Sequence, residues 1–168
     1  MAKWSLPMVE GDRYAFTELT DEGLEYIAAN LRACDREELH ASVGHRRYAD
    51  ALRVSVAHSA SAVMAVNAYG EPVAVLGVST LSVLYNTGCP WMMATPQANR
   101  HKRAFIKAAR VYTEAMLKEY ARLENHVDTR NAESVAWLQH LGFKVESPEP
   151  YGPFGLLFHP FSLERSYV

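Results

Sequence analysis

Residues Cys89 to Lys144 read CPWMMATPQANRHKRAFIKAARVYTEAMLKEYARLENHVDTRNAESVAWLQHLGFK and carry the strongest signals for the fold. This stretch predicts a strand at Pro90–Thr95 and a basic turn at 96–102. Apolar residues then recur at helical spacing at Phe105, Ala109, Tyr112, Met116 and Tyr120. A second strand, Leu123–Thr129, leads into a helix that Asn131 begins and Gly142 ends. The predicted unit is therefore two strands joined through a long helix and closed by a second helix.

The rest of the chain predicts helices first and strands afterwards. Cap and periodicity signals place helices after Thr20, from Cys34, and from Arg46 to about His58. Further strands are predicted at Trp4–Val9, Ser61–Ala68, Pro72–Val83, just after Phe143 and at Gly155–Leu163, with turns at 69–72 and 86–88 and a loop at 147–153. We expect one domain over residues 1–168, of α+β class, with a mixed but mostly antiparallel central sheet flanked by helices.

Composition narrows the classes of function. Hydrophobic residues make up 49% of the chain and charged ones 21%, which is ordinary for a globular protein, and a net charge of -2 gives no reason to expect a nucleic-acid partner. No apolar run is long enough to span a membrane. Cys34 and Cys89 are too few for a disulfide framework, and the histidines share no metal-ligand spacing, so we predict a reducing intracellular setting and no metal site.

The basic turn predicts an anion site. Arg100, His101, Lys102 and Arg103 crowd the start of the long helix, where unpaired N–H groups already carry partial positive charge. Cations are unfavourable there unless an anion such as phosphate sits in the turn. The alternative is a solvated basic loop whose repulsion salt screens.

Asn131 suits the N-cap of the second helix, and Gly142-Phe143 suits a left-handed stop followed by an apolar contact. Cap and stop explain these residues without any function. An asparagine at a strand end beside a cleft can also bond the amide of an extended ligand.

This order of elements resembles the GCN5-related N-acetyltransferase (GNAT) superfamily, whose signature is strand, phosphate-cradling turn, helix, strand, and an Asn-initiated helix ending in Gly-Phe. The matching residues are Asn131, Ser134, Leu141, Gly142 and Phe143. Residues 70–161 also resemble the phage family typified by the T7-type internal virion protein. The matching segments there are GEPVAVLG (70–77), PW (90–91), RAF (103–105), DTRN (128–131), WL (137–138), LGF (141–143) and PYG (150–152).

The resemblance implies acetyl-coenzyme A as cosubstrate, with its pantetheine arm between two splayed strands and its pyrophosphate on the basic turn. The implied binding residues are Met92, Met93, Ala94 and Thr95 of the strand, Gln97, Asn99, Arg100, Lys102 and Arg103 of the turn, and Asn131, Ser134 and Trp137 of the second helix. The chain departs from the family twice. The turn has no glycine, and Leu138 stands where many members have a tyrosine that protonates the thiolate.

Acetyl transfer to an amine needs a base and an acid. His126 and Asp128 share one face of their strand with Glu124 by two-residue alternation, so a water-linked base from this group is one candidate. An outward polar face is the competing interpretation. Tyr151 could bring a hydroxyl to the thiol, or simply anchor its loop.

Two functions remain open at this point. One is a phage-encoded N-acetyltransferase that acts on a primary amine of a protein or small molecule. The other is a virion, assembly or host-factor-binding protein that kept the fold without the chemistry. Both predict the host cytoplasm or the virion as location. Homodimerisation is open too, because Tyr85, Trp91 and Phe154 could lie at an interface, although core positions are the preferred prediction.

Overall fold

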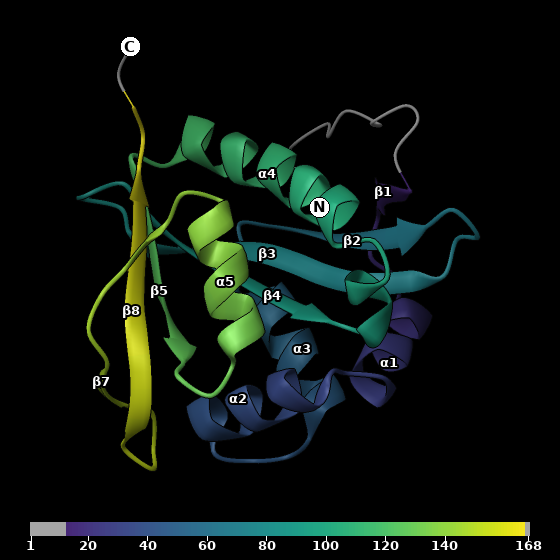
Figure 1. The fold of residues 1–168 in the computed structure, drawn as a ribbon, viewed down its shortest axis with the longest axis horizontal. Coiled ribbons are helices and arrows are strands. Elements are labelled where there is room, and N and C mark those ends of the chain that lie inside the picture. Colours follow the sequence, from purple (N-terminus) through teal and green to yellow (C-terminus); the bar gives the residue numbers. More distant parts are fainter. Residues whose placement is uncertain (1–12, 167–168) are drawn as a thin grey trace.

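One sheet separates two groups of helices in the computed structural model, which describes residues 13–166 (Figure 1). The strands are β1 (Tyr14–Thr17), β2 (Ser61–Asn67), β3 (Pro72–Ser82), β4 (Thr87–Ala94), β5 (Arg122–Asp128), β6 (Lys144–Val145), β7 (Glu149–Tyr151) and β8 (Leu156–Glu164). The helices are α1 (Asp21–Ala29), α2 (Ala33–Val43), α3 (Tyr48–Ala57), the 3-10 turn η1 (Pro96–Asn99), α4 (Lys102–Glu119) and α5 (Ala132–His140). The predicted α+β class is confirmed.

The sheet follows the order β1-β2-β3-β4-β5-β8-β6, with β7 also paired to β8. Every pairing is antiparallel except that of β4 with β5, which is parallel. The chain reaches β5 from β4 through η1 and α4, as a parallel pair requires.

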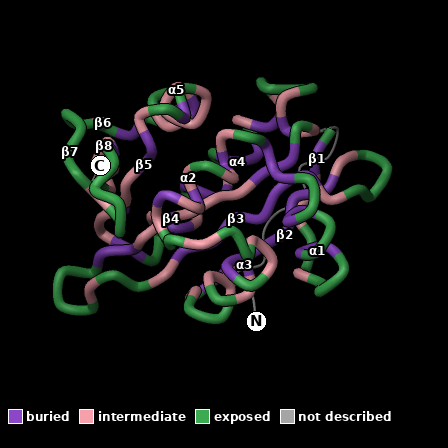
Figure 2. The backbone as a smooth tube through the Cα atoms, turned by 90° about the horizontal axis from the view of Figure 1, so that it is seen from below, coloured by how far each residue is buried: buried purple, intermediate pink, exposed green. Residues whose placement is uncertain are grey.

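Both faces of the sheet are covered, which explains why β2 reads as an unbroken apolar run. Val63 and Ala65 point into the core beneath α4 and α5, whereas Met64 and Val66 point into the core beneath α1 and α3. Successive side chains of a strand alternate between faces, so one strand contributes to both cores. Figure 2 shows the buried backbone concentrated along β2 and β3, between the two groups of helices.

The local signals of the central unit act as predicted. Phe105, Tyr112 and Met116 form the buried face of α4. The Asn131 side chain accepts a hydrogen bond from the backbone N–H of Ser134, which caps α5, and Gly142 follows the helix with φ +95°.

Two local predictions differ from the structure. Residues 87–88, predicted as a turn, already belong to β4, because the preceding turn closes at Asn86 with a positive φ of 48°. The predicted loop at 147–153 contains β7, which pairs with β8. The predicted strand at Trp4–Val9 lies outside the described residues, and β1 was not predicted.

The preferred core assignment of two aromatic residues is wrong. The exposed fraction is 76% for Tyr85 and 53% for Phe154. Tyr85 lies in the turn between β3 and β4, and Phe154 lies in the turn between β7 and β8, where its ring contacts only the edge of the helical layer at His40 of α2, 5.2 Å between ring centroids. Trp91 packs on the α1–α3 side, and its indole N–H donates to Ser59 Oγ at 2.9 Å.

Gly77 of β3 should be intolerant of a side chain, because a Cβ there would lie 2.5 Å from ring atoms of Trp91. We expect Gly77→Ala to lower the free energy of unfolding by about 1–3 kcal/mol through overpacking. Urea denaturation measures the loss. In a Trp91→Leu background the same change should have a clearly smaller effect, and equal effects in both backgrounds would contradict the assigned clash.

Candidate functional site

The central feature of the site is the divergence of β4 from β5. Their described pairing comprises Thr87 with Arg122 and Gly88 with Leu123. The next β4 residue that faces β5 is Pro90, which has no N–H to donate, and its carbonyl instead accepts from Asn125 Nδ2 at 2.8 Å. The strands therefore separate from this point toward their carboxyl ends.

Backbone alternation shows which β4 groups point into the opening. The N–H of Thr95 bonds the carbonyl of Val73 at 2.8 Å, so odd-numbered residues of β4 pair with β3. Met92 and Ala94 consequently turn their N–H and C=O groups toward β5. An extended ligand entering the opening would meet these two residues first.

A cavity of about 460 Å³ passes through the sheet at this opening. Pro90, Trp91, Met92 and Met93 line it from β4, and Asn125, His126 and Val127 line it from β5. On one side of the sheet it reaches α2 and α3, and on the other it reaches α4 and α5. Two molecules entering from opposite faces could thus meet between the strands.

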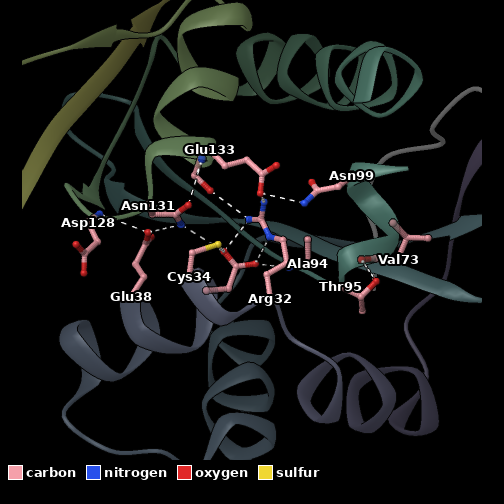
Figure 3. Close-up of polar contacts among 12 residues, drawn as sticks. Arg32, Cys34, Glu38, Val73, Ala94, Thr95, Asn99, Asp128, Asn131 and Glu133 are labelled. Atoms are coloured by element: carbon pink, nitrogen blue, oxygen red, sulfur yellow. Dashed lines mark hydrogen bonds and ion pairs between the residues drawn. The ribbon is translucent and has the colours of Figure 1, made fainter. Parts of the chain in front are cut away.

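A buried arginine closes the wide end of the opening (Figure 3). Arg32 is only 4% exposed, and its guanidinium donates to both carboxylate oxygens of Asp35 at 2.7 and 2.8 Å. It also lies over the Trp137 ring, 4.5 Å from the centroid. The backbone N–H of Arg32 donates to the carbonyl of Ala94, and Asp35 accepts from the Ala94 N–H. This arrangement satisfies both inward-facing backbone groups of Ala94.

A carboxylate already lies where cations converge. Glu133, in the first turn of α5, accepts from Arg32 at 3.0 Å and from Asn99 Nδ2 at 3.1 Å, and it lies 3.3 Å from Lys102 Nζ. Burial alone would raise the pKa of Glu133, but the hydrogen bonds from Asn99 and Lys102 and the charge of Arg32 lower it. We call Arg32, Asp35 and Glu133 the Arg32 cluster. Glu133 shows that this corner of the site stabilises an anion.

A second carboxyl group, Glu38 of α2, faces the cavity. Its Oε2 accepts from Asn131 Nδ2 at 2.7 Å and from the backbone N–H of Asp128 at 3.4 Å. Burial, aided by the nearby charges of Asp35 and Asp128, raises the pKa of Glu38 to about 8 despite these hydrogen bonds. Glu38 can therefore exchange a proton near neutral pH.

No protein-family model matches the sequence, and no match was found among curated proteins. Solved acetyltransferase structures do match. A GNAT-family acetyltransferase from Bacillus anthracis is 11% identical, with a TM-score of 0.70 over 95% of this chain and 99% of that one. The protein has the GNAT fold.

Two further structures with the GNAT fold illustrate the range of acceptors. Ribosomal-protein-S5-alanine acetyltransferase from Vibrio fischeri is 15% identical, covering 95% of this chain and 97% of that one with a TM-score of 0.65. Spermidine N-acetyltransferase from Vibrio cholerae, solved with CoA and spermine, is 13% identical, covering 91% and 96% with a TM-score of 0.65. Nothing in these comparisons supports the predicted likeness to the phage virion family.

Of the predicted catalytic residues, the GNAT fold brings His126 and Tyr151 together. Their rings stack at 4.2 Å with an interplanar angle of 15°, and His126 Nε2 lies 3.1 Å from Glu149 Oε1. Both rings line the cavity. Burial, with a contribution from Cys89, raises the pKa of Tyr151, so its hydroxyl keeps its proton. Pairing of β7 with β8 holds Tyr151 in this position.

Asp128 lies apart from them. It is 1% exposed, it is not among the described residues that line the cavity, and its carboxylate accepts several hydrogen bonds from Arg130, the shortest at 2.5 Å. Burial alone would raise the pKa of Asp128, but the hydrogen bonds and charge of Arg130 lower it below its ordinary value. A carboxylate held in this way is a weak base, and its position on β5 is structural.

The predicted cosubstrate residues are distributed as follows. Met92 faces the opening, Met93 and Thr95 direct their backbone groups to β3, and those of Ala94 are bonded to α2 and the residue before it. Asn99, Lys102 and Asn131 meet around the Arg32 cluster, whereas the backbone carbonyl of Gln97 accepts from Tyr14. Ser134 and Trp137 line the cavity, and Arg100 and Arg103 are exposed in the turn. Their binding roles stay predictions.

Sequence reasoning missed Arg32, Asp35 and Glu38. Arg32 is the residue before α2, and Asp35 and Glu38 lie in the first two turns of that helix. The polar composition of this segment resembles that of an exposed helix. One signal was available: Asp35, Glu38 and Leu39 share a helical face, so the buried side of α2 carries carboxylates.

No group of three or more His, Cys, Asp or Glu side chains is arranged to hold a metal ion within residues 13–166. None of the helices described is long and apolar enough to cross a membrane.

Removing the Arg32 guanidinium should strongly destabilise the protein, because it would leave the Asp35 carboxylate buried without its cation. We expect Arg32→Met to lower the free energy of unfolding by about 3–5 kcal/mol, measured by urea denaturation. The control is Arg46→Met, which removes a solvent-exposed pair with Glu37 and should cost less than about 1 kcal/mol. Similar losses in the two variants would contradict the buried role of Arg32.

Glu38 predicts a specific pH dependence of stability. Its pKa rises from 4.5 in the unfolded chain to about 8 in the folded protein. Between these values the folded state binds more protons than the unfolded state, so stability falls as pH rises through this window. Glu38→Gln does not titrate, so its stability relative to wild type should increase by at least about 1 kcal/mol between about pH 5 and about pH 9, measured by urea denaturation. A constant difference across this range would contradict the raised pKa.

Proposed function

We propose that the protein is an N-acetyltransferase that transfers the acetyl group of acetyl-CoA to a primary amine. The observation that carries this proposal is the cavity that passes through the sheet between β4 and β5, at the end where α4 and α5 both begin. Support also comes from the GNAT fold and from the CoA-bound structure of the spermidine N-acetyltransferase.

The chain's own residues fit acetyl-CoA in two places. Met92 offers a backbone N–H and C=O to the amides of an extended arm, and Asn131 lies at the same opening. The corner that now holds the Glu133 carboxylate, formed by Arg32, Asn99 and Lys102, suits a diphosphate. Acetyl-CoA supplies an activated thioester, and Glu133 must yield its place for the diphosphate to use these partners.

Tyr151 and His126 are the residues we assign to proton movement. The Tyr151 hydroxyl keeps its proton because burial raises its pKa, which suits a donor to a departing thiolate. The His126 ring stacks on the Tyr151 ring and is hydrogen-bonded to Glu149, so it fixes the phenol against the cavity wall. Tyr151 would thus serve where the superfamily's helix tyrosine is replaced by Leu138.

A second function is favoured by a specific observation. Arg32 and Asp35 already bond both inward-facing groups of Ala94, and the turn before α4 has no glycine to let phosphates approach its backbone. These features suit a protein that kept the fold and lost the chemistry, such as a virion, assembly or host-factor-binding protein of a phage. In either case we propose the host cytoplasm, or the virion, as its location.

Calorimetric titration with acetyl-CoA tests the cosubstrate directly. We expect binding that weakens several-fold as salt rises, and a similar loss in the Lys102→Ala, Arg103→Ala variant, because cations hold the diphosphate. Release of free thiol from acetyl-CoA in the presence of amines then measures turnover. No binding at millimolar acetyl-CoA would favour the non-catalytic function.

Glu133 gives a gain-of-affinity test. Glu133→Gln keeps the side-chain shape and removes the competing charge, so acetyl-CoA should bind several-fold more tightly, by about 1 kcal/mol. The control is Glu114→Gln, which removes one charge from the exposed face of α4 and should leave affinity unchanged. Weaker binding in Glu133→Gln would mean that the diphosphate does not occupy this corner.

A further inference from the structure

We propose that the acetyl acceptor is a monoamine with an apolar body, whose amino group binds Glu38 and whose body lies against the cavity wall formed by α2, α3 and Trp91. The inference deepens the proposed acetyl transfer and rests on it. It concerns the mouth of the cavity on the α2 and α3 side of the sheet, opposite α4 and α5.

The charged side chains on the cavity wall favour a ligand with a single amino group. Among the described residues, Glu38 is the only carboxyl-bearing side chain that lines the cavity, and neither lysine nor arginine lines it. A desolvated ammonium group needs an anionic partner. One carboxylate can serve one ammonium group, so a polyamine would have to place its other charges outside this cavity, toward the neighbouring hollow that Glu124, Glu146 and Glu149 line.

The remainder of the wall suits an apolar body. Leu39 and Val43 of α2, Leu52 and Val54 of α3, and Met93 of β4 line the cavity. Trp91 adds a large ring whose position is fixed by its hydrogen bond to Ser59. Ser42, Ser55 and His58 also line this side, but apolar side chains predominate, so a ligand would be bound mainly by removal of its apolar surface from water.

Glu38 is held ready for this contact. Both of its hydrogen bonds end on Oε2, from Asn131 of α5 and from the backbone of Asp128, which leaves Oε1 for a ligand donor. Those bonds fix the carboxyl group beside the opening between β4 and β5. An amine bound there lies next to the place where the two faces of the sheet communicate.

Proton exchange at Glu38 gives the site a measurable signature. The groups that face it are Asp35 of α2, Asp128 of β5 and Asn131 of α5, with Arg130 beyond Asp128. Burial keeps the pKa of Glu38 at about 8, so its carboxyl group is largely protonated at neutral pH. An arriving ammonium group favours the carboxylate and lowers that pKa, so binding should release a proton.

Calorimetry on the full-length protein tests the inference with three probes: phenethylamine, phenethyl alcohol, which lacks the charge, and spermidine, which lacks the apolar body. We expect phenethylamine to bind at least about tenfold more tightly than either of the others. Its binding enthalpy at neutral pH should vary with the ionisation enthalpy of the buffer, which reports the released proton. Equal or tighter binding of spermidine or of the alcohol would overturn the inference, as would an enthalpy independent of buffer.

A matched pair of variants locates the amine. Glu38→Gln should weaken phenethylamine binding at least about tenfold and leave acetyl-CoA binding unchanged, whereas Glu37→Gln, on the exposed side of the same helix, should change neither. If Glu38→Gln fails to fold, calorimetric titration of the wild-type protein with the three probes still tests the inference. Unchanged phenethylamine binding in folded Glu38→Gln would overturn the inference.

Different experimental results would overturn the acceptor class and the proposed acetyl transfer. Acetyl-CoA binding with turnover of spermidine but not phenethylamine would overturn only the acceptor class. Amine binding without acetyl-CoA binding would overturn the proposed transfer.

Discussion

The structure depends on a single missing hydrogen-bond donor. β4 and β5 begin as a parallel pair. After Gly88, the next β4 residue whose backbone faces β5 is Pro90, which has no N–H to donate. Asn125 compensates by donating its side-chain amide to the Pro90 carbonyl, which spans the widening gap without closing it. Everything that gives the protein a site follows from this separation: the cavity through the sheet and the unpaired inward face of Met92.

An opened sheet exposes backbone groups and helix N-termini that must find partners, and the Arg32 cluster supplies them. Asp35 and the Arg32 backbone form hydrogen bonds with the Ala94 backbone. Glu133 accepts a hydrogen bond from Asn99 and pairs with Lys102 at the start of α4. The same contacts occupy positions that a long anionic ligand would use. The cluster therefore stabilises the ligand-free protein and competes with its proposed ligand, so binding must exchange one set of partners for another.

Their surroundings give the carboxyl groups of Asp128 and Glu38 opposite affinities for a proton. Arg130 holds Asp128 ionised, whereas burial next to two acids keeps Glu38 protonated to about pH 8. These carboxyl groups lie close enough for the Asp128 backbone to donate to Glu38, yet they have opposite proton affinities. Only Glu38 faces the cavity, so of these two carboxyl groups it is the one placed to exchange a proton there.

The central unit can be predicted from the sequence alone. The spacing of Phe105, Tyr112 and Met116, the cap at Asn131 and the stop at Gly142 are local signals, and each acts within one or two turns of chain. The basic turn was likewise readable as an anion site, because charge at a helix N-terminus has a local meaning. Which groups meet at that turn depends instead on packing between distant parts of the chain. Arg32 lies 101 residues from Glu133 in the chain and Glu38 lies 93 from Asn131, and contacts over such separations depend on how α2 packs across the opened sheet.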